Sequence, residues 1–296
     1  MESTIKFILI NIGYAEHHAD WNYQQVVSPF TRIYLPVAGR AKVHMPNGSY
    51  DVEPGYLYII PAYCMHHYQC DSDFSLYYIH LYEEEDNHLT IGENYNFEHK
   101  IPATEIDNVV VKHLLACNPD KSLRSYNPQF YDNHTTFIGD ISISTHDAPH
   151  LQMETESILR LLISHFVKYA KPKNEKLDDR IAKTLLYIRS NLANPIEVAD
   201  LAKLSCVSVE YFTRKFTSQI GESPIKYIQT KRMQRAQLLL MVNTTHIKDV
   251  AYAVGFNDVS YFNRVFKKTV GCTPQEYRRQ IQIQPTDSNE ITAIEI

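Results

Sequence analysis

The sequence predicts an α+β fold of two domains, an N-terminal β-rich domain with following helices and a C-terminal domain made only of helices. Three observations carry this prediction. Short β-rich runs separated by turn residues fill the first 85 residues, a duplicated helical pattern begins near residue 198, and the two halves differ in charge. A chain of 296 residues is long enough to form two hydrophobic cores.

The N-terminal part contains short runs of β-branched and aromatic residues with no long helix before about residue 105. Asn47-Gly48 predicts a hairpin turn because both residues tolerate positive φ, and Pro54-Gly55 marks a second turn. Strands at this spacing are typical of a sandwich or a barrel. The predicted strands are 7–12, 30–40, 41–45, 50–52, 56–60 and 74–82.

Residues 153–169 predict a helix whose apolar side chains extend beyond one face. So wide a stripe has more to bury than one domain surface usually accepts. Part of the helix is therefore expected to pair with the same helix of a second chain in a homodimer, the alternative being that it packs only under its own domain. The predicted limits are a first domain at 1–169, a polar linker at 170–176, a second domain at 177–284 and a flexible tail at 285–296.

The C-terminal part contains one helix-turn-helix pattern twice. Matching residues are 49 apart before the turn and 50 apart after it, so one residue is inserted in the second turn. Such a duplication is hard to obtain by chance and predicts two tandem DNA-reading units. The matching pairs are Val198 and Ile247, Leu201 and Val250, Ala202 and Ala251, Phe212 and Phe262, Arg214 and Arg264, Phe216 and Phe266, Gly221 and Gly271, Pro224 and Pro274, and Tyr227 and Tyr277.

The second helix of each unit is expected to read DNA. Ser208 is expected to cap the first of these helices, and Asn257 or Asp258 the second. Arginine and asparagine can address base edges in the major groove, whereas lysine and serine more often hold phosphate; a structural or phosphate contact is the alternative for Arg214 and Arg264. The predicted DNA-binding residues are Glu210, Thr213, Arg214, Thr217, Ser260, Asn263, Arg264 and Lys267.

A predicted helix from Pro224 to Met241 connects the two units. Its length of about 27 Å at ~1.5 Å per residue can hold the two recognition helices about one DNA turn apart, near 34 Å, so one chain would read two successive major-groove segments. The basic residues along this connector either contact phosphates or only make it soluble. They are Lys226, Lys231, Arg232 and Arg235.

The net charge of −5 conceals an uneven distribution. Lysine and arginine outnumber acids in the C-terminal domain, and acids outnumber them before it. This division suits a reader of double-stranded DNA joined to a domain that does not touch phosphates. The five cysteines are scattered, which indicates reduced thiols and a cytoplasmic location. The apolar run at 7–12 is too short for a signal peptide or a membrane span, so no membrane partner is expected.

Motif residues cluster in two places. The C-terminal part contains Ala251, Gly255, Phe256, Ser260, Tyr261, Phe262, Arg264, Phe266, Lys267, Lys268, Gly271, Thr273, Pro274 and Tyr277, and the N-terminal part a looser set of Gly39, Gly55, Pro61 and His66. In these residues the chain resembles AraC/XylS-type transcription regulators, closely over 177–279 and more loosely over 20–85. The resemblance implies a cupin-like sensory barrel before a double helix-turn-helix domain. Its implied partners are double-stranded DNA, a small-molecule effector, a second copy of the chain and RNA polymerase.

The metal-binding pattern of many cupins is incomplete here. His44 has no second histidine two residues later, and the second motif keeps only His66 with His67 beside it. No metal, no cofactor and no enzymatic activity are therefore expected in the barrel.

The barrel is rich in tyrosine, which offers a flat face for stacking and a hydroxyl for hydrogen bonding. This composition favours a small-molecule pocket, with a saccharide as one candidate ligand, although ordinary half-buried strand residues would look the same. Similarity to the sugar-sensing member of the family implies inward-pointing side chains on the strands and Trp21 on a covering arm, but Ala38 stands where that sensor has an arginine. The implied ligand-binding residues are Trp21, Arg32, Tyr34, His66, Tyr68 and Tyr77.

These observations predict a sequence-specific DNA-binding transcription regulator controlled by a small metabolite bound in the barrel. Two alternatives belong to other classes. One is a ligand-independent regulator whose barrel only dimerises, and the other is a cupin enzyme with a DNA-binding appendage.

Overall fold

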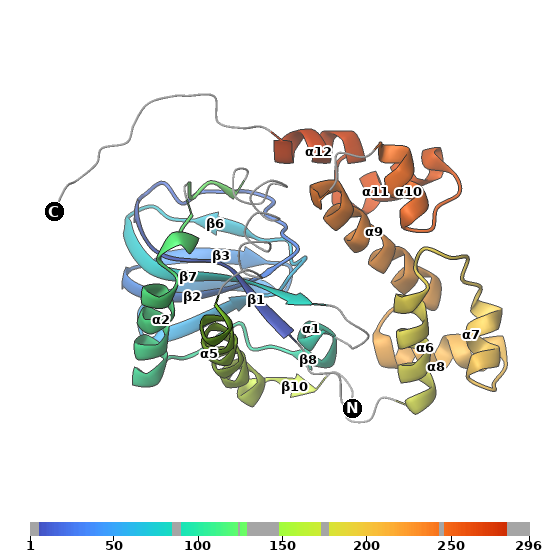
Figure 1. Ribbon diagram of the computed structural model, residues 1–296, viewed down its shortest axis with the longest axis horizontal. Coiled ribbons are helices and arrows are strands. Elements are labelled where there is room, and N and C mark those ends of the chain that lie inside the picture. The colour runs from blue at the N-terminus through green and yellow to red at the C-terminus, as the bar shows by residue number, and fades with distance from the viewer. Residues whose placement is uncertain are drawn as a thin grey trace.

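The N-terminal domain is built on two antiparallel sheets that face each other as a cupin-like barrel (Figure 1). The computed structural model describes residues 6–84, 90–123, 125–128, 148–172, 178–242 and 246–282. Within them, one sheet has the strand order β1-β7-β2-β5-β9 and the other β4-β3-β6, with a short β10-β8 pair beside them. The bounds are β1 Lys6–His18, β2 Thr31–Gly39, β3 Ala41–Met45, β4 Gly48–Val52, β5 Tyr56–Ile60, β6 His67–Gln69, β7 Asp73–Glu84, β8 Tyr95–Asn96, β9 Lys100–Pro102 and β10 Lys171–Pro172.

The predicted strands and the predicted hairpin are confirmed. Met45 of β3 pairs with Gly48 of β4, so the loop consists of Pro46 and Asn47, one residue earlier than an Asn-Gly turn would place it. The strand at the N-terminus is longer than predicted because β1 pairs along almost its whole length with β7.

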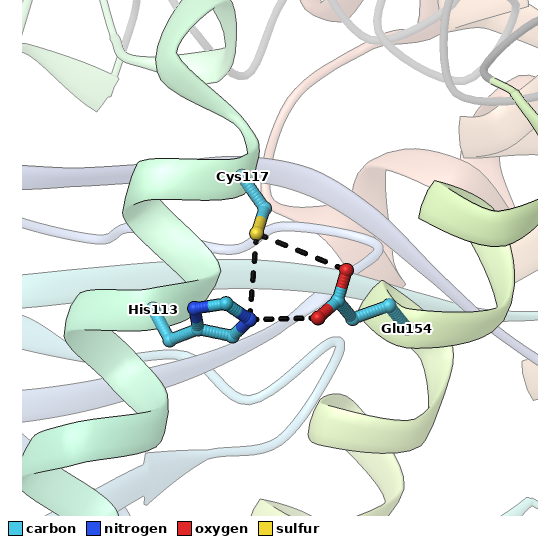
Figure 2. A group of neighbouring side chains, drawn as sticks. All are labelled: His113, Cys117 and Glu154. Atoms are coloured by element: carbon cyan, nitrogen blue, oxygen red, sulfur yellow. Dashed lines mark hydrogen bonds and ion pairs between the residues drawn. The ribbon is translucent and has the colours of Figure 1, made fainter.

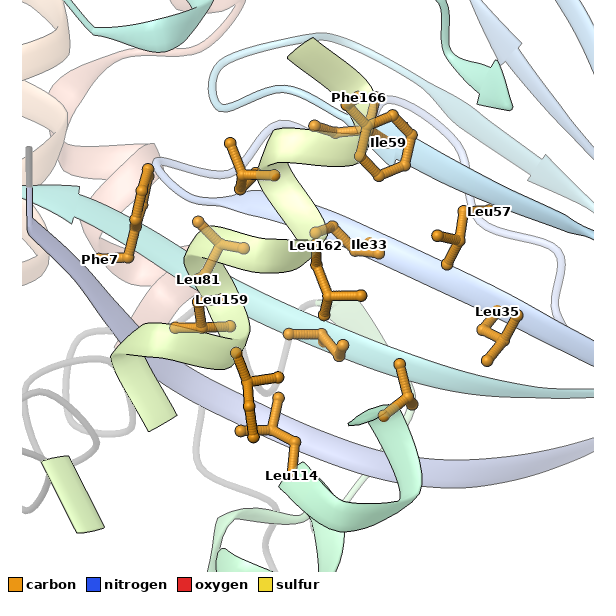
Figure 3. Close-up of a cluster of buried hydrophobic side chains, with 14 of the residues drawn as sticks. Phe7, Ile33, Leu35, Leu57, Ile59, Leu81, Leu114, Leu159, Leu162 and Phe166 are labelled. Atoms are coloured by element: carbon orange, nitrogen blue, oxygen red, sulfur yellow. The ribbon is translucent and has the colours of Figure 1, made fainter. Parts of the chain in front are cut away.

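Two helices, α2 (Glu105–Cys117) and α5 (Pro149–Tyr169), cover the outer face of the larger sheet (Figure 3). A capping box between Thr104 and Asp107 starts α2. The predicted helix at 153–169 is confirmed and begins earlier, at Pro149, since proline suits the first helical turn. Its buried face, packed on sheet residues such as Ile33 and Leu81, consists of Ile158, Leu159, Leu162, Ile163 and Phe166.

Most of the apolar stripe of α5 is thus covered by its own domain. Leu161 and Tyr169 remain exposed, at 37% and 43% of their surface. On α2, Ile106 and Val109 are more exposed still. The side of the helix pair that faces away from the sheet is therefore the part left for a second chain.

The C-terminal domain consists of helices, as predicted (Figure 1). Ser208 caps α8 and Asp258 caps α11, while Gly221 and Gly271 end these helices in the left-handed conformation. In the turns, Gly255 has a positive φ where the first unit has Cys206 at φ 55°. The helices, with the short α1 and η1 of the first domain, are α1 Ile91–Asn94, η1 Pro119–Lys121, α6 Asp179–Ser190, α7 Val198–Leu204, α8 Val209–Ile220, α9 Pro224–Val242, α10 Ile247–Ala253, α11 Val259–Val270 and α12 Pro274–Gln282.

The core of the second unit extends into the N-terminal domain. Ile10 and Phe30, each 1% exposed, belong to the same apolar cluster as Met233, Ala236 and Leu240 of α9. The pairing of β1 with β7 shifts register between Leu9 and Asn11, so the intervening Ile10 is a bulge residue, and a bulge redirects a side chain from its expected face. The two domains therefore share buried surface.

The predicted linker at 170–176 and tail at 285–296 lie largely or wholly outside the described residues, which omit 173–177 and 283–296. Among the helices that the structure describes, none has the length and apolar character needed to cross a membrane.

Candidate DNA interface and effector sites

The recognition helices α8 and α11 present corresponding faces. Phe212 and Phe216 of α8 are fully buried, as are Phe262 and Phe266 of α11, so the opposite side of each helix faces solvent. Of the predicted DNA-binding residues, Glu210, Arg214, Thr217, Ser260, Arg264 and Lys267 are exposed, while Thr213 and Asn263 are half-buried.

An exposed tyrosine supports the arginine on each recognition helix. The guanidinium carbon of Arg214 lies 5.6 Å from the centre of the Tyr211 ring, and that of Arg264 lies 5.9 Å from the centre of the Tyr261 ring. A cation over an aromatic face is held electrostatically at about this distance. Both arginines are therefore partly oriented before any DNA arrives, an arrangement repeated in the two units. Asn263 differs, because its side-chain oxygen is buried without a hydrogen-bond partner among the described residues.

Arg232 of α9 joins the two units. Its Nε donates to the carbonyl oxygen of Leu192 at 3.0 Å, its terminal nitrogen donates to the carbonyl oxygen of Asn194 at 2.7 Å, and its guanidinium lies 5.6 Å from the centre of the Phe256 ring. Leu192 and Asn194 precede the first unit, whereas Phe256 lies in the turn of the second. The connector arginine thus has a structural role, which is neither of the two roles expected for it.

The other basic residues of α9 differ among themselves. Lys226 lies 3.8 Å from the Glu222 carboxylate, Lys231 is buried at 7% exposure, and Arg235 is exposed. Arg235 is the one of the three best placed to reach a phosphate. Figure 1 shows α9, the helix that contains Arg235, running between the two units.

A chain of hydrogen bonds crosses the barrel interior. The hydroxyls of Tyr34 and Tyr68 lie 2.6 Å apart, and the Tyr68 hydroxyl lies 2.7 Å from Nε2 of His66. Nδ1 of His66 lies 2.8 Å from the carbonyl oxygen of Cys64, to which it donates, so Nε2 is the acceptor in this tautomer. Buried Arg32 donates to the Ser28 hydroxyl beside this chain.

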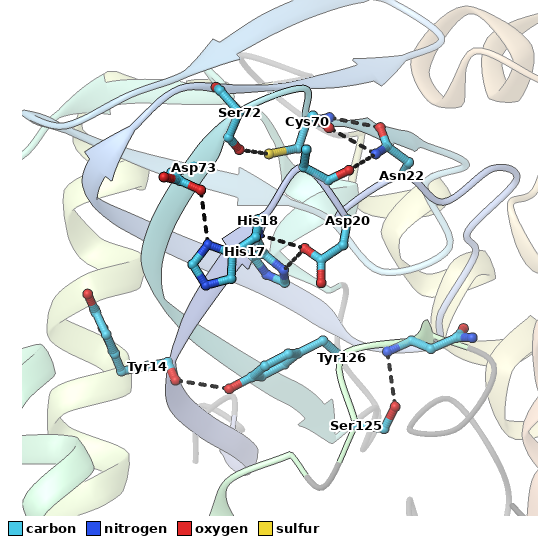
Figure 4. A network of polar contacts seen from close by, with 12 residues as sticks. Tyr14, His17, His18, Asp20, Asn22, Cys70, Ser72, Asp73, Ser125 and Tyr126 are labelled. Atoms are coloured by element: carbon cyan, nitrogen blue, oxygen red, sulfur yellow. Dashed lines mark hydrogen bonds and ion pairs between the residues drawn. The ribbon is translucent and has the colours of Figure 1, made fainter. Parts of the chain in front are cut away.

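The Trp21 side chain is buried inside the barrel. Its ring stacks on Tyr68 with 4.1 Å between ring centres and on Phe74 at 5.5 Å. Both neighbours in the sequence are held in place (Figure 4): Asp20 accepts from the backbone nitrogen of His18 at 3.1 Å, and Asn22 bonds to both backbone groups of Cys70 at 2.9 Å. The indole therefore covers one face of the Tyr68 ring.

The hollow inside the barrel and those between the domains differ sharply in size. The one inside the barrel, bounded by residues such as Tyr34, Tyr78 and His80, measures about 20 Å³, room for roughly one water molecule. Of those between the domains, one measures about 540 Å³ and another, bounded by residues such as Val26, Met65 and Cys272, about 720 Å³. Both lie within the range of ~300–1,000 Å³ typical of ligand pockets. The apolar side of the 540 Å³ hollow includes Phe7, Ile59, Leu81, Ile91, Phe97 and Ile163, and its polar side Asn47, Tyr63, Glu83, Asn96, His99, Lys231 and Gln234.

Two family models match the chain in the order of its domains. The AraC-like ligand binding domain matches residues 11–117, and the helix-turn-helix domain matches residues 201–280. The chain belongs to the AraC family of transcriptional regulators. The first of these models covers the barrel, and the second covers both recognition helices.

Individual relatives of this AraC-family chain match part of its length or its overall fold. It is 32% identical over 120 residues to the arabinose operon regulatory protein of Escherichia coli strain K12, which covers 40% of this chain and 41% of that protein. It is 34% identical over 104 residues to the regulatory protein PocR of Salmonella typhimurium, covering 35% and 34%. The chain thus spans about two fifths or less of these curated relatives. A crystal structure of unsaturated fatty acid bound ToxT from Vibrio cholerae covers 95% of this chain and 98% of its own at 18% identity, with a TM-score of 0.50, and shows a shared fold.

The structure of this AraC-family chain brings five of the six predicted barrel residues together. Trp21, Tyr34 and Tyr68 belong to one buried cluster, with Arg32 and His66 bonded beside it. The inward orientation expected for Tyr77 is wrong. Tyr77 pairs with Leu35 and packs in the outer cluster under α2 and α5, because neighbouring strand residues point to opposite faces. Ligand contact by these residues remains a prediction.

Sequence reasoning missed several residues of these sites. The inward-facing neighbour of Tyr77 is Tyr78, which pairs with Tyr34 and whose hydroxyl accepts from the backbone nitrogen of Leu123 at 2.8 Å. Period-two alternation along β7 could have found it. Tyr211 and Tyr261 stand exactly one repeat apart, so the duplication itself contained their signal.

Buried His66 should make the stability of the N-terminal domain depend on pH. Burial, and next the charge of Arg32, lowers the pKa of His66 from 6.5 to about 3. Between pH 6.5 and 3 this histidine is protonated in the unfolded chain but neutral in the folded chain. The full free energy of unfolding is therefore present above pH 6.5, and it falls by ~1.4 kcal/mol per pH unit as the pH decreases toward 3. Urea unfolding followed by Trp21 fluorescence should show a shallower pH dependence in His66→Gln than in the unmodified chain. Exposed His150→Gln is the control, and an unchanged dependence in His66→Gln would contradict the assignment.

Proposed function

We propose that this chain is a sequence-specific DNA-binding transcription regulator that reads two successive major-groove segments and responds to a small molecule. The observation that carries the proposal is the pair of matched recognition helices, each with a tyrosine-supported arginine, joined through Arg232. The connector α9 is about 28 Å long at ~1.5 Å per residue, which suits half-sites about one DNA turn apart.

Arg264→Ala is expected to lower affinity for the specific site by ~1–3 kcal/mol and to relax base preference at one position, since a bidentate arginine discriminates between bases. The site is obtained by selecting bound fragments from genomic DNA with the full-length protein. Affinities are then measured on that site, on single-base variants and on random duplex at two salt concentrations.

Arg160→Ala is the matched control. This arginine of α5 forms an ion pair with Glu156 at 2.6 Å and is distant in the sequence from the recognition helices. It should leave all DNA affinities unchanged. Equal loss by Arg264→Ala on specific and random duplexes would mean that Arg264 holds phosphate and reads no base.

We further propose that the effector binds between the domains. The 540 Å³ hollow there is large enough for a metabolite and is lined by both domains, whereas the barrel interior is filled by side chains around Trp21. The apolar side of the hollow suits a molecule with an apolar body, and Lys231 and Gln234 on α9 suit a polar or anionic group. A ligand that contacts α9 and the barrel together favours one domain arrangement over another, which is what regulation requires.

A thermal-shift screen of the full chain tests where and whether an effector binds. The probes are mono- and oligosaccharides and medium- and long-chain carboxylic acids, each tested also on Gly92→Leu. Gly92 lines the hollow and an added Cβ would meet nothing within 4 Å, so a larger side chain can start there without a clash at Cβ and is expected to occupy part of the hollow. A response lost in Gly92→Leu supports the interdomain site, a saccharide response that survives supports the barrel, and no response to any probe favours a ligand-independent regulator.

We propose, too, that the chain dimerises through the side of α2 and α5 that faces away from the sheet, where Ile106, Val109 and Leu161 are exposed. RNA polymerase is the further partner that a regulator of transcription would contact. Sedimentation of the full chain at micromolar concentration tests the dimer, and a purely monomeric profile would exclude it at that concentration.

A further inference from the structure

Three side chains with metal-binding atoms meet between α2 and α5, away from the barrel interior and from the recognition helices (Figure 2). His113 and Cys117 lie one turn apart on α2, and Glu154 lies in the early part of α5. Nε2 of His113 is 2.7 Å from a Glu154 oxygen, and the Cys117 sulfur is 3.5 Å from the same Nε2 and 3.9 Å from the second Glu154 oxygen.

These separations are close to the edges of a metal tetrahedron. With Zn–N and Zn–O near 2.0–2.1 Å and Zn–S near 2.3 Å, tetrahedral angles put N and O about 3.3 Å apart and sulfur about 3.5 Å from each. The N–S separation already fits. Glu154 would bind through one of its oxygens: Oε1 must move about 0.6 Å away from His113 Nε2, or Oε2 must move about 0.4 Å toward the Cys117 sulfur. Side chains that are 51% exposed for His113 and 44% for Glu154 can make such adjustments.

We propose that His113, Cys117 and Glu154 form a binding site for zinc(II), with water as the fourth ligand. Imidazole, thiolate and carboxylate are the three ligand types that zinc takes in proteins, and the soft sulfur disfavours magnesium and calcium. The Cys117 thiol loses its proton to solvent when the Zn–S bond forms, whereas the carboxylate and the neutral imidazole bind without losing one. In the absence of metal, burial and the charge of Glu154 raise the pKa of the Cys117 thiol.

The bound ion would link two helices that are distant in the sequence. Cys117 is the last residue of α2 and Glu154 lies near the start of α5, so the metal closes the loop formed by the residues between them. Closing a loop restricts the unfolded chain more than the folded one. Occupancy should therefore stabilise the helix layer that covers the larger sheet.

Cobalt(II) titration of the metal-free full-length chain tests the site. One equivalent of Co²⁺ should bind with a thiolate-to-cobalt charge-transfer band in the near ultraviolet and visible bands of four-coordinate intensity, and Zn²⁺ should displace it. Cys117→Ser should abolish the thiolate band. Glu154→Gln should weaken binding at least about tenfold, since loss of even an outer partner of a metal ligand costs ~10–100-fold.

Cys206→Ser is the control, because Cys206 is an exposed thiol in the C-terminal domain and its loss should leave the band intact. In the presence of chelator, Cys117→Ser and the unmodified chain should melt at the same temperature, and added Zn²⁺ should raise the melting temperature of the unmodified chain only. Absence of the thiolate band, or its survival in Cys117→Ser, would overturn the proposal.

Discussion

Gly255→Ala is expected to lower the free energy of unfolding of the C-terminal domain by about 2–5 kcal/mol and to weaken binding to DNA that contains both half-sites. Gly255 has a φ of +85°, and an added Cβ would lie 2.3 Å from the carbonyl oxygen of Leu192 and 2.8 Å from a terminal nitrogen of Arg232. A left-handed non-glycine residue costs ~1–2 kcal/mol, and overpacking costs ~1–3 kcal/mol more. Relief of the clash would displace Arg232 from Leu192 and so alter the angle between the two units.

Gly221→Ala separates these two costs. Gly221 has almost the same φ of +86°, but an added Cβ there would meet nothing within 4 Å. Its substitution should cost only the backbone term, ~1–2 kcal/mol, and leave the contact between units intact. Urea unfolding and DNA affinity of both variants decide the matter, and equal losses in the two would show that the crowding around Gly255 has no consequence.

Phe30→Ala is expected to lower the stability of the chain by ~3–5 kcal/mol, the usual cost of truncating a buried phenylalanine, and to separate the unfolding of the two domains. Phe30 belongs to the cluster that includes Met233, Ala236 and Leu240 of α9. Trp21 is the single tryptophan of the chain and reports on the barrel, while far-UV circular dichroism reports mainly on helices. The two transitions should coincide in the unmodified chain and move apart in Phe30→Ala.

Phe74→Ala provides the comparison for this experiment. Phe74 is equally buried, at 2% exposure, but it belongs to the cluster inside the barrel. Its loss should destabilise the barrel while leaving the contact between domains, so the two probes should still change together. Coincident transitions in Phe30→Ala would mean that the shared cluster does not couple the domains.

Features set by nearby residues could be predicted from the sequence. The recognition helices and their caps at Ser208 and Asp258 follow from local hydrogen bonding and from the spacing of Phe212 and Phe216, and the structure confirms them. The strands of the barrel and its hairpin are likewise encoded in alternation and turn residues. The duplication strengthens the prediction for the C-terminal domain because the same helix-turn-helix pattern occurs in both units.

Features that depend on residues far apart in the chain could not be predicted. In the sequence, Arg232 looks like any other basic residue of an exposed helix. Its role is not visible there because its hydrogen-bond acceptors are backbone oxygens of another segment. The His113, Cys117 and Glu154 cluster matches no motif, since its ligands come from two helices. Tyr77 was misplaced for a simpler reason: one residue of register along β7 decides which face a side chain joins.

Because Ile10 and Phe30 are buried against α9, the linker is not the only physical connection between the domains. The helix that spaces the two DNA-reading units is in direct contact with the N-terminal domain, so a change in that domain can reach both units without passing along the linker. Substitutions, insertions or deletions within 170–176 are then expected to have little effect on regulation. The bulge at Ile10 and the segment before β2 are constrained instead by partners that lie more than two hundred residues further along the chain.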